Sequence, residues 1–234
     1  MAILECRDAL QVIKADMGNK YRPADTLAKT CTDYAHIVIL SHRNKYYRNP
    51  KEAGTSIQSA ILVAMRKLGV EGLPPAMETG RSAVVLKIIG KALTDTRYHI
   101  KQQIFASLAS HAKGKPIDIA KLARMCISGS SAKATAAMYQ RLGVLRGIAS
   151  DYAKKGGSIS GKQMSDDSAD SFWISVDAQL ALYYSEFSKE DRQGLWEMLY
   201  ENDTKTHGNP DATISITEAK NLDDWLNTLN NAVA

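Results

Sequence analysis

The densest concentration of groups able to bind a polyanion lies between residues 41 and 51, in the run SHRNKYYRNPK. Its cations are Arg43, Lys45, Arg48 and Lys51, and two adjacent aromatics, Tyr46 and Tyr47, lie among them. Cationic side chains hold a phosphate backbone while an exposed tyrosine ring stacks on an unpaired base, a combination suited to single-stranded nucleic acid. The run equally fits a surface loop whose tyrosines fold into the core, and one buried and one exposed tyrosine would satisfy both interpretations.

A second group of cations comprises Lys87, Lys91, Arg97 and Lys101. Residues four apart in a helix lie on the same face, so the first two and the last two of these form pairs. Lys113, Lys115, Lys121 and Arg124 follow along the chain. Converging faces would form a basic groove, whereas diverging faces would leave the cations as solvated surface, and the sequence leaves both open.

Charge is strongly segregated along the chain, which has 234 residues and a formal net charge of +5. Residues 1–162 contain 26 lysines and arginines and 11 aspartates and glutamates, a net charge of +15. Residues 163–234 contain 4 and 14, a net charge of −10. A basic excess of this size attracts polyanions through counterion release. The acidic part would pack on its own basic part, dock on a neighbouring copy, or shield the binding surface.

Other chemistries have weak support. Residues 156–162 have the G-x-x-x-x-G-K spacing of a phosphate-binding loop, but Gln163 replaces the required Ser or Thr, and the preceding residues read as a helix. We interpret this stretch as a glycine-rich connector with basic ends. The five histidines have no compact ligand spacing and no nucleophile motif is present, so we expect no metal, no cofactor and no enzymatic activity. The three cysteines, Cys6, Cys31 and Cys126, are far apart and read as reduced core thiols.

The elements that must position these groups are predicted to be helices. Apolar residues recur at helical spacing nearly everywhere, which predicts an all-α fold of nine or ten helices. Only 36–40 resembles a strand, and it is too short to build a sheet. Residues typical of helix starts and ends predict a helix over 116–128, with Pro116 in its first turn. They predict a second helix that is capped by Ser131 and extends to Tyr152. Its apolar face is expected to include Ala134, Met138, Leu142, Leu145 and Ile148, with Arg141 and Arg146 on the flanks.

Three sections follow from the breaks in the pattern: an N-terminal helical lobe with the basic tyrosine loop (1–75), a basic helical core with the glycine-rich connector (76–162), and an acidic helical section (163–234). The acidic section reads as folded, because Ser188 with Asp191 and Ser215 with Glu218 have capping-box spacing. It also contains Trp173, Trp196 and Trp225.

The longest apolar runs are far shorter than the roughly 20 residues of a membrane-spanning helix, so no membrane association is expected. Charged residues interrupt the first 16 residues where a signal peptide would have an apolar centre. We therefore expect an intracellular location: cytoplasmic, nuclear or within an intracellular particle.

Two resemblances bear on the fold. Five segments, IGKALTDTRYHIKQQIFASL, PIDIAKLARMC, MYQRLGVLR, FWISVDAQL and LYENDTKTHG, resemble in order an uncharacterised family of fungal helical domains over about residues 88–208. This resemblance implies helices there and carries no reaction. By size, helicity and charge, the chain is also similar to the nucleoproteins of segmented negative-strand RNA viruses, which coat genomic RNA in a basic cleft and self-associate. That analogy implies a fold and charge class only.

These observations predict a non-enzymatic basic protein that coats single-stranded RNA (or DNA), with RNA favoured, without strong sequence preference, and forms a nucleocapsid-like homo-oligomer. In this hypothesis the acidic helices after residue 163 bind the adjacent subunit. One alternative is a sequence-specific DNA-binding regulatory or mobile-element module, with the helix over 131–152 in a major groove. Another is a helical protein-interaction or structural protein.

Overall fold

The computed structural model describes residues 21–42, 44–48, 56–156 and 166–210, and within them the secondary structure is entirely helical. Seven helices follow one another: α2 (Asp25–Leu40), α3 (Ile57–Lys67), α4 (Thr79–Ala112), α5 (Ile119–Cys126), α6 (Ala136–Lys154), α7 (Asp166–Glu186) and α8 (Lys189–His207). The all-α prediction is confirmed for this part of the chain.

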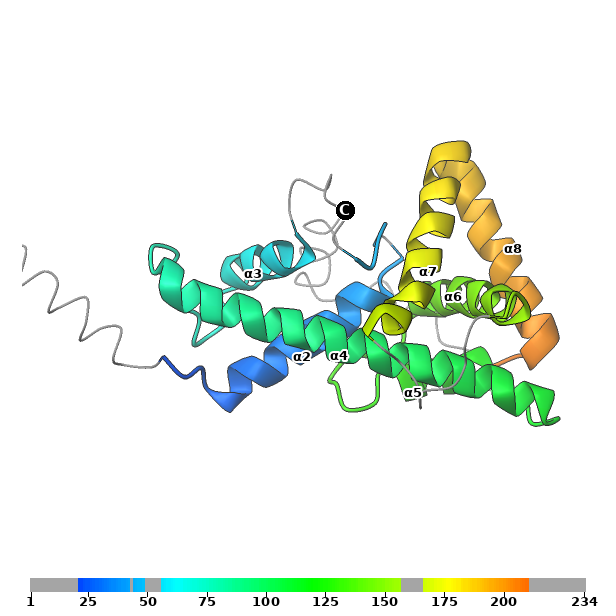
Figure 1. Ribbon diagram of the computed structural model, residues 1–234, viewed down its shortest axis with the longest axis horizontal. Coiled ribbons are helices and arrows are strands. Elements are labelled where there is room, and N and C mark those ends of the chain that lie inside the picture. The colour runs from blue at the N-terminus through cyan, green and yellow to red at the C-terminus, as the bar shows by residue number, and fades with distance from the viewer. Residues whose placement is uncertain (1–20, 43, 49–55, 157–165, 211–234) are drawn as a thin grey trace, which may run out of the picture.

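The long helix α4 is the backbone of the fold. It extends over 34 residues, and α2, α3, α5 and α6 all pack against it, as Figure 1 shows. The helix α6 is the second centre, because it contacts α5, α7 and α8 as well as α4. In Figure 1 the helices α7 and α8 form a hairpin that rises from the end of the molecule built by α4, α5 and α6.

The expected count of nine or ten helices is not supported, because the described residues form seven. One physical reason lies in α4, which is about three times the mean length of a helix and uses as one element a stretch long enough for two or three. The stretch 36–40 is also not a strand; it forms the buried last turn of α2 against α4.

Local capping signals define most helix starts. Ser56, Asp118, Thr135 and Ser188 each accept a hydrogen bond from a backbone N–H in the first turn of the helix that follows. The predicted cap at Ser188 is confirmed, since its Oγ lies 3.1 Å from the Asp191 amide. The Ser215 prediction lies outside the described residues.

Two predicted helix starts are wrong by a few residues. The helix expected from Pro116 begins at Ile119, because Asp118 provides the cap. The helix expected from Ser131 begins at Ala136, because Thr135 caps it instead. Ser131 is used elsewhere: its N–H and Oγ both donate to the carboxylate of Asp33, on α2, at 2.9 and 2.6 Å.

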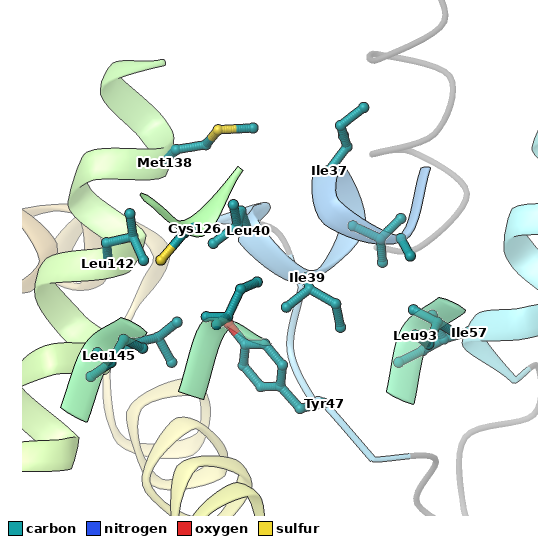
Figure 2. Packing of buried hydrophobic residues seen from close by; sticks show 14 of the residues in the cluster. Ile37, Ile39, Leu40, Tyr47, Ile57, Leu93, Cys126, Met138, Leu142 and Leu145 are labelled. Atoms are coloured by element: carbon teal, nitrogen blue, oxygen red, sulfur yellow. The ribbon is translucent and has the colours of Figure 1, made fainter. Parts of the chain in front are cut away.

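One continuous core joins the helices. It contains side chains from all seven helices, and Figure 2 shows part of it, including Tyr47. Cys31 and Cys126 are free and fully buried within it, as predicted, whereas Cys6 lies outside the described residues. Burial raises the pKa of these thiols to about 11 and about 12, respectively, so both are protonated at neutral pH.

No helix in the described part of the chain has the length and apolar character needed to cross a membrane.

Candidate nucleic-acid interface

Tyr47 anchors the basic loop to the core. Only 1% of its surface is exposed, its ring centroid lies 4.5 Å from that of Trp173 on α7, and its hydroxyl accepts a hydrogen bond from Arg141 Nε on α6 at 2.7 Å. Burial raises the pKa of the Tyr47 hydroxyl, which therefore stays protonated. Because this ring is enclosed, we do not retain Tyr47 as a platform for base stacking, and its role is to fix the loop.

Three side chains, one each from α7, α4 and α6, form hydrogen bonds with the loop backbone. Asp177 on α7 accepts hydrogen bonds from the amides of Tyr47 at 2.6 Å and Arg48 at 2.9 Å, one on each carboxylate oxygen. Arg97 Nη1 donates to the Tyr47 carbonyl at 2.7 Å. Arg141 Nη2 donates to the Asn44 carbonyl at 2.7 Å. The conformation of residues 44–48 is therefore set by α4, α6 and α7 together.

Anchoring of Tyr47 leaves two neighbouring cations on the surface. Lys45 and Arg48 are both exposed, and Lys45 Nζ lies 5.9 Å from the ring centroid of Tyr184 on α7. Tyr46 is half-buried and packs against the core. Arg43 and Lys51 lie outside the described residues. We call the surface formed by Lys45, Tyr46 and Arg48 the loop face.

The predicted strip on α4 divides into two parts. Lys87 and Lys91 are exposed, and Lys91 Nζ lies 2.5 Å from Asp95 Oδ2 on the same helix. Arg97 is half-buried and holds the loop, while Lys101 is buried with its Nζ 5.8 Å from the ring centroid of Phe172. The structure therefore brings Arg97 beneath the loop as a support, places Lys101 in the interior beside Phe172, and leaves Lys87 and Lys91 on the surface further along α4.

Arg141 and Arg146 were expected on the flanks of α6, but both side chains are buried, with 2% and 1% of their surface exposed. The correction has a physical reason: each guanidinium satisfies backbone or side-chain oxygens inside the fold. The guanidinium of Arg146 donates from Nε and Nη2 to the two carboxylate oxygens of Asp203 on α8, and from Nη1 to the Ile117 carbonyl at 2.7 Å. The predicted apolar residues Met138, Leu142, Leu145 and Ile148 are buried, and Ala134 is half-buried against the core.

His207 lies beside this ion pair at the end of α8 and is 6% exposed. Its ring centroid is 4.7 Å from that of His111, at the end of α4. Burial, together with the positive charge of Arg146, lowers the pKa of His207 to about 4, and the carboxylate of Asp203 only partly opposes this. His207 is therefore neutral near pH 7.

Asp177 has an unusual balance of forces. Burial raises the pKa of its carboxyl above the ordinary value, although hydrogen bonds from two amides and the charges of Arg141 and Arg48 act in the opposite direction. The effect of burial on the pKa of this carboxyl thus outweighs that of the surrounding positive charges and donors.

The sequence analysis missed Trp173, Asp177 and Tyr184 as partners of the loop. They are spaced by four and seven residues, so they share one face of α7. This spacing was visible in the sequence, but nothing in it indicated which part of the chain that face would meet.

Among the described residues, no group of three or more His, Cys, Asp or Glu side chains is arranged to hold a metal ion. Within the same residues, the loop presents two exposed cations and is held from beneath by the buried Arg141 and the half-buried Arg97. No family model, curated protein or solved structure matches the chain.

Proposed function

We propose that this chain is a non-enzymatic protein that binds single-stranded nucleic acid, RNA or DNA, coats it without strong sequence preference, and self-associates. The observation that carries the proposal is the segregation of charge, +15 over residues 1–162 against −10 over residues 163–234. Phosphate contacts dominate non-specific affinity and carry no sequence information, so a basic surface of this kind suits strand coating.

The loop face provides the best-defined contact point for a phosphate backbone. Lys45 and Arg48 are exposed on a loop whose backbone is held by hydrogen bonds from Arg97 and Arg141 and to Asp177. Cations on a prearranged loop lose less conformational entropy on binding than cations on a mobile one. Tyr46, which is half-buried, remains our candidate for stacking on a base.

The other predicted cations enter the proposal in different roles. Lys87 and Lys91 would extend the contact with phosphates along α4. Arg97 would act through the loop, because it is hydrogen-bonded to the Tyr47 carbonyl. The buried position of Lys101 removes it from direct contact with phosphates.

Self-association is assigned to the α7–α8 hairpin. Ile174, Leu182 and Met198 are large apolar side chains that are each more than two-fifths exposed there, and Glu190 and Glu197 are also exposed. A surface that combines apolar and acidic groups complements the basic part of a neighbouring copy.

The alternative of a helix in the major groove of DNA has no favouring observation in α6. Its two arginines, Arg141 and Arg146, are buried and already hydrogen-bonded within the protein. The protein-interaction alternative is separated from our proposal by the experiments below.

The first experiment tests the loop face with a matched control. Binding of a short, fluorescently labelled oligouridylate is measured across a range of salt concentrations for the wild type, for K45A/R48A and for K67A/R124A. The control removes the same two residue types from exposed positions on α3 and α5. Loss of two phosphate contacts should lower the slope of log affinity against log salt by about 1.4, since each contact to a single strand contributes about 0.7.

The K45A/R48A variant should weaken binding equally for oligonucleotides of different sequence, and K67A/R124A should leave the slope near that of the wild type. Equal slopes for both double variants would remove the loop face from the interface. No binding by the wild type at low salt would refute the proposed function.

Assembly is tested on protein purified at low salt, by its absorbance ratio at 260 and 280 nm and by its mass before and after treatment with nuclease and high salt. A large, nucleic-acid-rich particle that collapses is expected. An assembly that persists unchanged and free of nucleic acid would favour the protein-interaction alternative.

A further inference from the structure

The two consecutive amides of Tyr47 and Arg48 form a small anion-binding concavity. Both N–H groups point at the same carboxylate, with Tyr47 N to Asp177 Oδ1 at 2.6 Å and Arg48 N to Asp177 Oδ2 at 2.9 Å. Successive backbone N–H groups that converge on one anion are a common way for proteins to bind phosphate as well as carboxylate. Two non-bridging oxygens of a phosphodiester offer the same pair of acceptors as the two oxygens of Asp177.

The electrostatic surroundings favour an anion at this point. Arg141 and Arg48 both act on the Asp177 carboxyl as neighbouring positive charges. Of these, Arg141 is 2% exposed, and the oxygens that it binds, the Tyr47 hydroxyl and the Asn44 carbonyl, are uncharged. The fold thus places a buried positive charge close to the two amides.

Solvent reaches this concavity from the loop face. The hydrogen bond from the Arg48 amide is exposed, whereas that from the Tyr47 amide is part-buried, and the side chains of Lys45 and Arg48 are exposed beside it. A strand whose phosphates contact these two cations would therefore bring a phosphate next to the Arg48 amide.

The charged form of Asp177 is disfavoured at its position, because burial raises the pKa of its carboxyl in spite of the surrounding hydrogen-bond donors. A carboxylate that is poorly solvated where it sits is easier to displace than one whose charge is fully compensated.

We propose that the amides of Tyr47 and Arg48, backed by Arg141, form a binding site for a backbone phosphate of the nucleic acid, and that in the free chain the Asp177 carboxylate occupies this site as an internal competitor. The inference rests on the proposed function, which it deepens by naming one phosphate contact. Binding at this site exchanges one anion for another. Asp177 therefore holds the loop in place in the free chain and, as a competitor, lowers the affinity of the site for a phosphate.

The test compares D177N with E186Q. Both substitutions remove one negative charge from α7, but Glu186 is exposed at the last position of the helix, nine residues after Asp177. Affinity for a labelled oligouridylate is measured at fixed salt. We expect D177N to bind about fivefold or more tightly than the wild type, the lower end of a typical coupling between two sites, and E186Q to change the affinity by less than about twofold.

A second measurement uses inorganic phosphate as the probe and the amide NMR signals of Tyr47 and Arg48 as the readout. In D177N both signals should shift on titration with phosphate, and in the wild type the same two signals should shift when the oligouridylate is added. The wild-type titration needs no variant, so it decides the question even if D177N does not fold.

The outcomes separate the two proposals. If wild type and E186Q bind the oligonucleotide but D177N binds no more tightly than E186Q, or if the two amide signals do not respond to it, Asp177 is a structural clamp and the site is refuted while the proposed function stands. If no folded variant binds the oligonucleotide, the proposed function fails. Phosphate-dependent shifts of both amides in D177N would then still establish the anion site, and their absence would refute it.

Discussion

The buried ion pair between α6 and α8 allows the strongest prediction about stability. The side chains of Arg146 and Asp203 are 1% and 5% exposed, and the carboxylate accepts from both Nε and Nη2 of the guanidinium. Substitution of Asp203 by alanine leaves a buried positive charge that still donates to the Ile117 carbonyl but has lost its carboxylate partner. Breaking a buried pair in this way costs about 3–5 kcal/mol, mostly as the penalty of the uncompensated charge.

The assay is urea unfolding followed by far-UV circular dichroism, together with thermal unfolding. For a chain of this length about 1 kcal/mol corresponds to about 2–4 °C, so D203A should lower the melting temperature by about 6–20 °C. The control is the double variant R146M/D203L, which replaces the pair by apolar side chains of similar length. We expect it to recover most of the lost stability, because the desolvation cost of both charges disappears with them.

The reasoning would be refuted in either of two ways. One is a loss of less than about 1 kcal/mol for D203A, the value of an exposed ion pair. The other is a double variant as unstable as the single one, which would mean that the side-chain shapes rather than the charges hold α8 against α6.

Three further predictions concern single positions. The pKa of His207 is lowered to about 4, so between that pH and the ordinary histidine pKa of 6.5 the folded chain binds fewer protons than the unfolded chain. The free energy of unfolding should therefore decrease as the pH falls through this window. The H207Q variant should show a smaller decrease, as measured by urea unfolding at several pH values. A Cβ at Gly143 would meet the backbone of α8 at 3.4 Å, so G143A should be tolerated while G143L should cost about 1–3 kcal/mol by overpacking, checked by the same unfolding assay. In a C6S variant, Cys31 and Cys126 should resist a thiol reagent in the native state and react on unfolding, because both are fully buried and protonated; rapid native labelling would contradict this packing.

Local rules predicted the helices well because a helix is stabilised by contacts within a few residues of the chain. The cap at Ser188 and the helices of the acidic section as far as residue 210 followed from spacing alone. The predicted starts of α5 and α6 were wrong for a local reason too. Asp118 competes with Pro116 as the start of α5, and Thr135 competes with Ser131 as the cap of α6. Propensity alone does not decide between two such nearby candidates.

The burial of the two arginines of α6 was missed because arginine is normally a surface residue. The pattern nevertheless contained a signal. Arg141 follows the buried Met138 by three residues and precedes the buried Leu145 by four, so it lies on a core-facing stripe. A charged residue at such a position indicates an internal partner, although not which partner.

The candidate site was less predictable than the helices, since it depends on contacts between distant parts of the chain. The contact between Tyr47 and Asp177 joins residues 130 positions apart. Composition correctly singled out residues 41–51 as rich in cations and tyrosines, but the burial of Tyr47 and the inward position of Lys101 depend on how α4, α6 and α7 meet. No periodicity within a single segment contains that information.

The acidic section has two kinds of carboxylate, and they should respond differently to salt. Asp203 is buried in an ion pair and Asp177 is half-buried and bound by two loop amides, whereas Glu186, Glu190 and Glu197 face solvent. Salt screens exposed charges over about a Debye length but acts weakly on buried pairs. High salt should therefore release nucleic acid and neighbouring copies while α7 and α8 stay attached to α6, giving a folded monomer with unchanged circular dichroism. Unfolding in parallel with release would show that the contacts within the chain are themselves of the exposed, screened kind, and that Asp203 and Asp177 do not hold the acidic section to the basic one.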